Sequence, residues 1–268
     1  MHKRLLLIIG LIIPLFLKAN ELELTGDFIQ GGMVIGQIQQ QILDANVDGV
    51  KVPIHPSGNV FVFGYGRDAK PESILTVNLA SGKQIQKSIN VKQREYKIDR
   101  VNGVASKYVS PPESVLSRIR ADSKIVKAAR ANLSFRTDFL IQTITPAKGR
   151  ISGVYGSQRV FNGVPKRPHF GMDIAAPTGT NVIAPLPGKV VLAEPDLYYS
   201  GGTLIIDHGM GITSTYIHLS KLHTKVGDEL ISGDLIAEIG ATGRVTGPHL
   251  DWRLNWFNRR LDPQLLLN

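Results

Sequence analysis

The sequence predicts a mainly β protein with an N-terminal β-sandwich-like domain, a helical connector and a compact antiparallel β-domain at the C-terminus. Three changes of pattern along the chain indicate this organisation. Short apolar segments alternate with turn residues over residues 20–106, helical spacing replaces them over residues 107–140, and strands rich in glycine and proline resume over residues 141–268. A chain of 268 residues is long enough for two modest hydrophobic cores.

Residues 1–19 have the plan of a secretory signal peptide. Met1–Arg4 is short and basic, and the apolar run Leu5–Leu17 is shorter than the roughly 20 residues of a membrane span. Removal of this segment would place the mature chain in the periplasm or elsewhere in the cell envelope, and an uncleaved N-terminal anchor is the alternative. We expect no membrane span in the mature chain.

Composition limits the possible ligands and partners. The chain contains no cysteine, so disulfides and thiolate ligands are excluded, and His, Asp or Glu would have to hold any transition metal. The formal net charge of +9 suits an anionic partner such as the cell wall, although it could also serve solubility alone. Nucleic acid is not an expected partner, because the basic residues are scattered rather than interleaved with aromatic ones.

The N-terminal segment has the pattern of a small antiparallel sandwich. Asn59–Gly64 and Ile74–Leu79 are typical of strands, and Ala80–Lys83 makes a turn into a further strand over Ile85–Val91. We find no catalytic cluster in this part of the sequence. His55 is isolated here and is expected to be structural.

A helical connector is predicted to begin at Ser110–Glu113, where a capping serine precedes two prolines and an acid. A break near Asp122–Ser123 is an alternative to one continuous helix. We expect this segment to pack between the two β-domains rather than against a membrane. The apolar residues that follow at helical spacing are Val115, Ile119, Val126, Ala129 and Leu133.

The C-terminal segment combines β-strands with most of the histidines. Five of the seven histidines, all but His2 and His55, lie in this segment, which indicates that the chemistry lies there. Strands are predicted at Lys189–Ala193, Thr203–Asp207, Ile212–His218, Leu235–Ile239 and Leu250–Trp256.

Two motifs supply the residue types of a metal site. His169 and Asp173 stand four residues apart, and this His and Asp pair is normal for zinc, although the spacing alone is a weak signal. Around His249-Leu250-Asp251, apolar and polar residues alternate strictly, so a strand would place His249 and Asp251 on one face. The residues directed to the core would be Leu250, Trp252, Leu254 and Trp256.

The other C-terminal histidines carry weaker signals. His218 ends a predicted strand and could act as a general acid or base only if it lies beside a metal site. His208 is expected to hydrogen-bond to the backbone at a turn, and His223 is expected to be exposed. We assign no catalytic role to His208 or His223.

From Gly149 to Asp262 the sequence resembles the lysostaphin-type, or LytM-like, zinc endopeptidases. The segment before the helix also resembles the small β-domain that precedes the peptidase in some exported relatives. The resemblance implies cleavage of the peptide cross-links of peptidoglycan. Five ordered blocks carry it: Gly149–Ser152 with Tyr155–Gly156, His169–Pro177, Asp207–Gly209, Tyr216–Ser220 and Thr242–Leu250.

The resemblance also implies a role for each matching residue. His169 and Asp173 match the first two zinc ligands. His218 and His249 match the catalytic histidines that orient and deprotonate the attacking water and stabilise the oxyanion. The metal would act as a Lewis acid and as the source of the nucleophile.

One position departs from the family pattern. The usual last motif is His-x-His, whose second histidine is the third zinc ligand, whereas this sequence has Asp251. A carboxylate can ligate zinc, so the expected metal set is His169, Asp173 and Asp251. Two carboxylates would neutralise the formal charge of the metal and make it a weaker Lewis acid.

Three functional classes therefore remain open at the level of sequence. The first is an exported zinc endopeptidase, the second a weak or inactive regulator of another cell-wall hydrolase, and the third a wall-binding module. A D-alanyl–diaminopimelate cross-link and a glycine-rich bridge are both consistent with the resemblance. The sequence does not identify a cell-wall or divisome partner.

Overall fold

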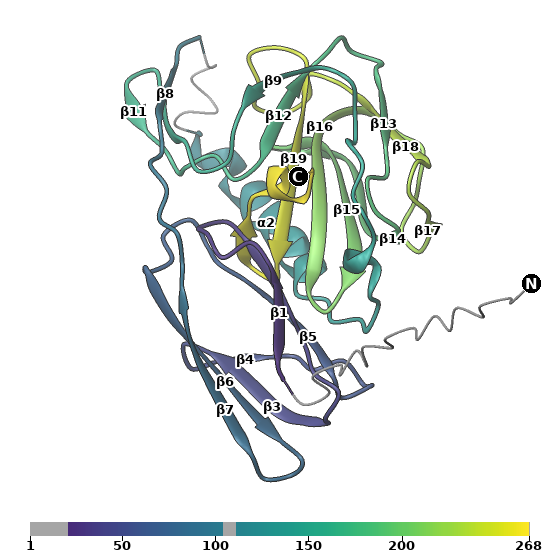
Figure 1. Cartoon of the computed structure of the whole chain (residues 1–268). Helices are drawn as coiled ribbons and strands as arrows, with labels where there is room; N and C mark the ends of the chain where they lie inside the picture. Colours follow the sequence, from purple (N-terminus) through teal and green to yellow (C-terminus); the bar gives the residue numbers. More distant parts are fainter. Residues whose placement is uncertain (1–20, 104–110, 268) are drawn as a thin grey trace, which may run out of the picture.

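The computed structural model describes residues 21–103 and 111–267, so the predicted signal peptide at residues 1–19 lies outside the described residues. The described chain is mainly β, as the sequence predicts, and it contains one α-helix (Figure 1). A smaller group of strands at the N-terminal end packs against one end of a larger C-terminal sheet.

The N-terminal strands form two small antiparallel sheets around one core. The first sheet has the order β1 (Glu23–Gly26), β2 (Met33–Gln37) and β5 (Val60–Gly64). The second has the order β4 (Val50–Val52), β3 (Ile42–Val47), β6 (Glu72–Leu79) and β7 (Gln84–Asn90). Alternate residues point inward, as expected for strands with one buried face. The core includes Val34, Phe61 and Phe63 from the first sheet and Val47, Leu75 and Val77 from the second.

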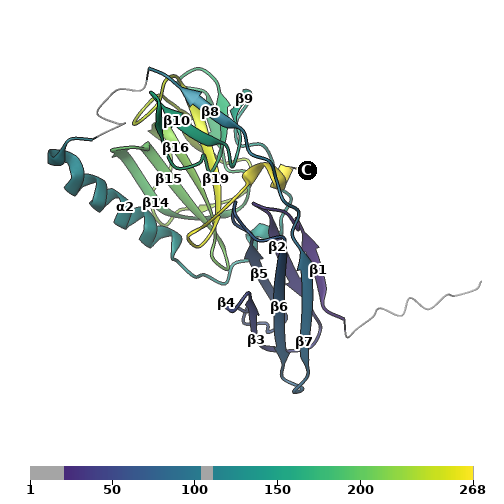
Figure 2. The same ribbon diagram turned by 90° about the vertical axis from the view of Figure 1, so that its left-hand side faces the viewer.

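Two segments connect this sandwich to the C-terminal sheet. Strand β8 (Ile98–Val101) leaves the sandwich and pairs in parallel with β10 (Gln158–Phe161), which in turn pairs with β11 (Val164–Pro165). Helix α2 (Leu116–Arg130) then lies beside β14 and β15 of the large sheet, as Figure 2 shows.

Helix α2 differs from the sequence prediction at three points. It lies beside β14 and β15 on the face of the large sheet rather than between the two β-domains. It is continuous through Asp122 and Ser123, so the alternative of a broken helix is wrong. It also ends at Arg130, so Leu133 lies beyond the helix and is exposed instead of extending the apolar stripe. Arg130 itself is buried, which an apolar pattern could not indicate. Short 3-10 turns flank the β-strands and the helix at Glu113–Val115, Asp138–Leu140 and Pro263–Leu267.

The C-terminal strands form a ten-stranded sheet that is mainly antiparallel. Its continuous path is β17-β14-β15-β16-β19-β12-β9, and β13, β18 and β20 pair at the side. The predicted strands of this segment are all present. The bounds are β9 (Arg150–Gly153), β12 (Met172–Ala175), β13 (Asn181–Ile183), β14 (Gly188–Leu197), β15 (Gly201–Gly209), β16 (Ile212–Leu222), β17 (Glu229–Leu230), β18 (Leu235–Ile239), β19 (His249–Trp256) and β20 (Arg259–Leu261).

Strand β19 confirms the predicted alternation. Leu250, Trp252, Leu254 and Trp256 are all buried in the hydrophobic cores. Because successive side chains of a strand point to opposite faces, Asp251 and its polar neighbours lie on the other face of the sheet. That face lies toward α2.

The N-terminal sandwich contacts the end of β19 that lies away from His249. Leu254, Trp256 and Leu261 belong to the same hydrophobic cluster as the sandwich core. An ion pair of 2.7 Å between Arg94 and the buried Asp262 strengthens this junction.

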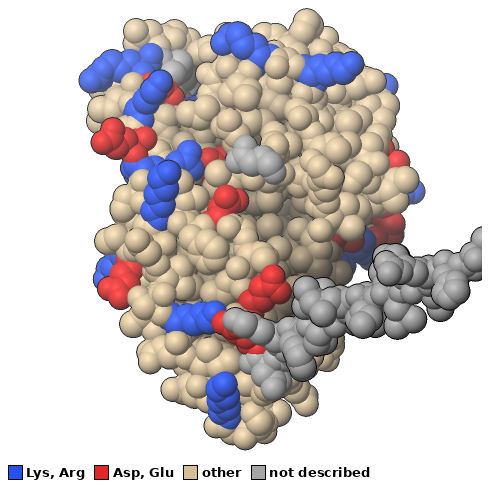
Figure 3. Space-filling model, viewed as in Figure 1, with Lys and Arg blue, Asp and Glu red and all other residues tan. Residues whose placement is uncertain are grey.

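On the face drawn in Figure 3, the positive charges do not gather in one patch. Basic and acidic side chains are interspersed there over a mostly uncharged surface. Among the described residues, no helix has the length and apolar character needed to cross a membrane.

Candidate metal centre

The two carboxylates of the predicted metal site come from neighbouring strands. Strands β12 and β19 pair antiparallel, and the register sets Asp173 directly opposite Asp251. His169 lies just before β12, where its backbone N–H donates to Ser157 and its carbonyl accepts from Gly156. These backbone bonds hold the imidazole beside the two strands.

Glycine allows the carboxylates to approach the backbone closely. A Cβ atom on Gly153 would overlap the carboxylate of Asp173, and one on Gly171 would overlap the carboxylate of Asp251. Both positions therefore require a residue without a side chain. Gly171 belongs to the His169–Asp173 motif, so its place in the sequence has a geometric cause.

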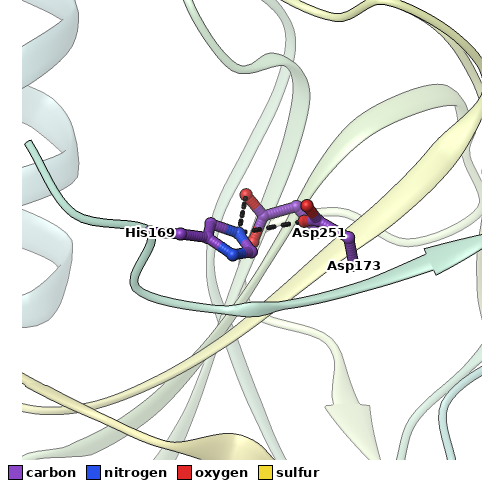
Figure 4. A group of neighbouring side chains, drawn as sticks. All are labelled: His169, Asp173 and Asp251. Atoms are coloured by element: carbon purple, nitrogen blue, oxygen red, sulfur yellow. Dashed lines mark ion pairs between the residues drawn. The ribbon is translucent and has the colours of Figure 1, made fainter. Parts of the chain in front are cut away.

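The three side chains converge on one point, as Figure 4 shows. His169 Nε2 lies 2.9 Å from Asp173 Oδ1 and 3.3 Å from Asp251 Oδ2. One potential ligand atom from each residue lies within 4.8 Å of the others. The residues are 2%, 6% and 1% exposed, so these atoms are withdrawn from water.

The hydrogen bonds of this group fit a bound cation. His169 Nδ1 lies 3.2 Å from the carbonyl oxygen of Val154, which can only accept, so Nδ1 is the donor there and Nε2 faces the carboxylates. Among the described residues, neither His169 Nε2 nor Asp173 Oδ1 has a hydrogen-bond partner, although both are buried. Buried acceptors that face one another in this way are costly unless a proton or a metal lies between them.

Two more histidines stand next to this group. The imidazole rings of His218 and His249 are 4.8 Å apart between centroids, and His249 Nε2 lies 3.8 Å from Asp173 Oδ1. His218 Nδ1 donates to the carbonyl of Thr242, and His249 Nδ1 donates to that of Gly247, both over 2.9 Å. Each ring therefore presents its Nε2 away from its backbone anchor. This arrangement fixes the tautomer, as in other metal sites.

The backbone of His218 is strained. Its φ angle is +68°, in the left-handed region that residues other than glycine and asparagine seldom adopt. Such strain is concentrated at functional sites. Burial lowers the pKa of His218 to about 3, with the nearby Asp251 acting in the opposite direction. The ring is therefore neutral at neutral pH, and its Nε2 is a hydrogen-bond acceptor.

Peptidase family M23 matches residues 167–263. Residues 167–263 form an M23 peptidase domain. This confirms the resemblance to the lysostaphin-type enzymes.

Two curated proteins are similar in sequence to this domain. Peptidoglycan DD-endopeptidase ShyA of Vibrio cholerae is 41% identical over 110 residues, which are 40% of this chain and 25% of the relative. DD-carboxypeptidase/endopeptidase Mpg of Neisseria meningitidis is 35% identical over 97 residues, which are 36% of this chain and 22% of the relative. The chain thus spans about a quarter of the length of these relatives.

The similarity to solved structures extends beyond the M23 domain. A Pseudomonas aeruginosa protein classed with peptidase M23 has a TM-score of 0.69 and 27% sequence identity. The match covers 89% of this chain and 94% of the other. The combination of an N-terminal sandwich, a helix and an M23 domain is therefore shared with this protein.

Two arginines beside the M23 site were missed in the sequence analysis. Arg253 forms two hydrogen bonds of 2.9 and 2.6 Å with the carboxylate of Asp251, and Arg159 contacts Asp173 Oδ2 at 2.5 Å. The alternation on β19 could have indicated Arg253, because it lies on the same face as Asp251. No sequence signal places Arg159, which comes from β10. The positive charges of Arg253 and Arg159 offset the negative charges of the two carboxylates, which by themselves would neutralise the charge of the metal.

The arginines also determine the charge state of the site. Burial would raise the pKa of Asp251, but Arg253 and then His169 lower it well below its usual range. Burial also opposes ionisation of Asp173, and so does Asp251, yet His169 and Arg159 keep its pKa below the usual value. Both groups are therefore carboxylates at neutral pH and are available as ligands.

The remaining histidines lie outside the site. His208 contacts the carbonyl of Pro187 at 2.6 Å and Ser214 at 2.7 Å, which confirms the predicted backbone bond. His223 is exposed, which confirms the prediction, and it pairs with Glu238 at 2.9 Å outside the site. His55 bonds to Ser57 and to the carbonyl of Phe135, in agreement with a structural role.

Proposed function

We propose that the protein is an exported zinc metalloendopeptidase that hydrolyses peptide cross-links of bacterial peptidoglycan. The observation that carries the proposal is the buried group of His169, Asp173 and Asp251, whose facing acceptor atoms fit a cation. The names of the M23 relatives ShyA and Mpg support a peptidoglycan substrate and an endopeptidase reaction.

His169, Asp173 and Asp251 would hold the zinc ion as one nitrogen and two oxygen ligands. A bound zinc ion would supply the Lewis acidity that polarises the scissile carbonyl and acidifies the attacking water. Arg253 and Arg159 hold the two carboxylates in place by hydrogen bonds to their oxygens. Partners of this kind orient the ligands of a metal and tune its affinity.

His218 and His249 act on the water and on the reacting carbonyl. Because the neutral ring of His218 accepts at Nε2, it orients the attacking water by accepting a hydrogen bond from it. His249 is less buried than His218, and its Nε2 takes the proton that the attacking water releases. The proton can then reach the leaving amine, as general acid–base catalysis requires.

The organisation of the chain is part of the same proposal. We assign residues 1–19 to a signal peptide, 20–106 to the sandwich domain, 107–140 to the connector and 141–268 to the peptidase domain. Export by this signal peptide would bring the enzyme to the periplasm or another part of the cell envelope, where its substrate lies.

A regulator without activity is the second candidate, and one observation favours it. Arg253 donates hydrogen bonds to both carboxylate oxygens of Asp251, so it competes with a metal ion for the lone pairs of these oxygens. A protein of this kind would bind the cell wall or another wall hydrolase without cleaving a bond.

The first test of the enzyme proposal is digestion of purified cross-linked muropeptides, read by mass spectrometry. We expect the protein to release monomers in the presence of zinc and to release none after the metal is removed by a chelator. Restoration of activity by added zinc is the control for damage by the chelator. A folded, zinc-loaded protein that leaves every cross-link intact would support the regulator instead.

A further inference from the structure

A cavity lies between helix α2 and the face of the M23 sheet that carries Asp251. Its volume is about 780 Å³, which is within the usual range for a ligand pocket. Ile119 and Val126 of α2 line one wall, and Thr215 and Ile217 of β16 line the other. His169 lies at its border, so the cavity is continuous with the candidate metal centre.

The lining of this cavity is strongly basic. Asp122 is the one acidic residue among the described residues that line it, and its carboxylate already accepts a 2.7 Å hydrogen bond from the backbone of Tyr198. Clefts lined by one sign of charge attract ligands of the opposite sign. Two lysines and six arginines contribute, the latter being Arg130, Arg159, Arg167, Arg244, Arg253 and Arg260.

Arg130 is the arginine of this lining that is buried. Its side chain comes from the last turn of α2, is 6% exposed and lines the cavity. No described residue accepts a hydrogen bond from its Nε, although that atom is buried. Burial lowers the pKa of Arg130 well below its usual range, and the charges of Arg260 and Arg253 add to this effect. A buried donor nitrogen without an acceptor, such as Arg130 Nε, is costly unless a ligand supplies one.

Arg260 reinforces the same position from the opposite wall. Burial, and then the charge of Arg253, lowers its pKa to about 10. One nitrogen donates to Asn255 Oδ1 at 2.6 Å, which is a neutral acceptor and leaves the positive charge uncompensated. Two guanidinium groups that line one cavity match the planar, bidentate geometry of a carboxylate.

We propose that Arg130 and Arg260 form a subsite for a carboxylate group of the peptide substrate. The proposal rests on the proposed function, because the substrate that reaches the metal centre is taken to be a peptidoglycan stem peptide. Stem peptides with diaminopimelate carry free carboxylates, whereas a glycine bridge is uncharged along its length. The subsite therefore selects the carboxylate-bearing D-alanyl–diaminopimelate cross-link over the glycine bridge.

The test measures binding to the metal-free, full-length protein, which cannot hydrolyse the ligand. The probe is a disaccharide tetrapeptide with free carboxylates, titrated by calorimetry. Two further probes carry an amide at diaminopimelate or at the terminal D-alanine, and they distinguish the two possible sources of the carboxylate. We expect one of the amides to bind about 10- to 100-fold more weakly, as is typical for loss of a charge-assisted hydrogen bond.

Variants of one helix provide a matched comparison. Arg130→Gln is expected to reduce the affinity for the free acid about 10-fold or more and to abolish the difference between acid and amide. Arg118→Gln also removes one positive charge from α2, but Arg118 is exposed and pairs with Asp196. This variant should change neither the affinity for the acid nor the difference between acid and amide. Circular dichroism and thermal melting show whether each variant is folded. If Arg130→Gln is unfolded, Arg260→Gln, on the opposite wall, takes its place in the comparison.

The outcomes separate this proposal from the proposed function. The protein could bind the acid selectively through Arg130 and yet hydrolyse nothing when loaded with zinc. That result would support the subsite and contradict the proposed enzymatic activity. Hydrolysis with equal affinity for acid and amide overturns the subsite and leaves the enzyme intact. Equal weakening of acid and amide by Arg130→Gln also overturns it, because the arginine would then contribute packing rather than charge.

Discussion

Replacement of His218 by asparagine is expected to lower the rate of cross-link hydrolysis by about 100- to 10,000-fold, the range typical of a positioned acid–base group. The substitution removes Nε2 but keeps a residue that tolerates the left-handed backbone at φ +68°. Zinc content should stay at the wild-type level, because His218 is not among the three grouped ligands. Single-turnover rates and metal analysis of the same preparation measure both quantities.

The control for this variant is His223→Asn. His223 follows the same strand, β16, but pairs with Glu238 outside the site, so the same change should leave the rate unchanged. A wild-type rate in a zinc-loaded His218→Asn protein would remove His218 from the reaction. A loss of zinc in that variant would instead make His218 part of the metal site.

Replacement of Asp251 by asparagine is expected to abolish both zinc binding and hydrolysis. The neutral amide is a poor ligand, and its loss of charge leaves Arg253 buried without its ion-pair partner. Removal of one partner of a buried pair typically costs about 3–5 kcal/mol, so the unfolding free energy should also fall. Denaturant unfolding of the metal-free protein measures this cost.

A second substitution separates ligation from stability. The double variant Asp251→Asn with Arg253→Met no longer contains the unpaired cation, so it should recover much of the lost unfolding free energy. It should remain unable to bind zinc, because the carboxylate is still missing. A double variant that binds zinc as tightly as the wild type would show that Asp251 is not a ligand.

The sequence predicts which residues belong to the site better than it predicts how they come together. Strict alternation around His249 and Asp251 correctly predicts which residues of β19 pack into the hydrophobic cores, since one face of the strand is directed to them. The pairing of Asp173 opposite Asp251 could not be predicted, because the register of β12 and β19 depends on contacts between distant segments. The resemblance to the peptidases supplied that information instead.

The basic residues show the limit of pattern analysis more clearly. Arg130 interrupts the apolar stripe of α2, and charged residues are almost never fully buried unless they are paired. Only the packing of α2 over the sheet reveals that Arg130 faces Arg253 and Arg260 in one cavity. The anionic partner that the net charge of +9 suggests stays a prediction, and this cavity is where we propose that an anionic group binds.

Zinc titration of the metal-free, full-length protein at pH 6, 7 and 8 tests the central claim most directly. Burial would lower the pKa of His169, but Asp251 and Asp173 raise it, so a proton competes with zinc at Nε2. This proton stabilises the metal-free fold below about pH 6.5, and the stabilisation is lost as the pH rises through the raised pKa. Zinc affinity should therefore increase with pH, by up to about tenfold per unit, until His169 is neutral.

Calorimetry should show one zinc ion per chain, with this increase of affinity with pH and with loss of binding in Asp173→Ala. Asp207→Asn, a change in a buried carboxylate of the same sheet outside the site, should bind zinc like the wild type. Wild-type protein that binds no zinc in the micromolar range at pH 8, or that binds it equally well without Asp173, would contradict the metal centre.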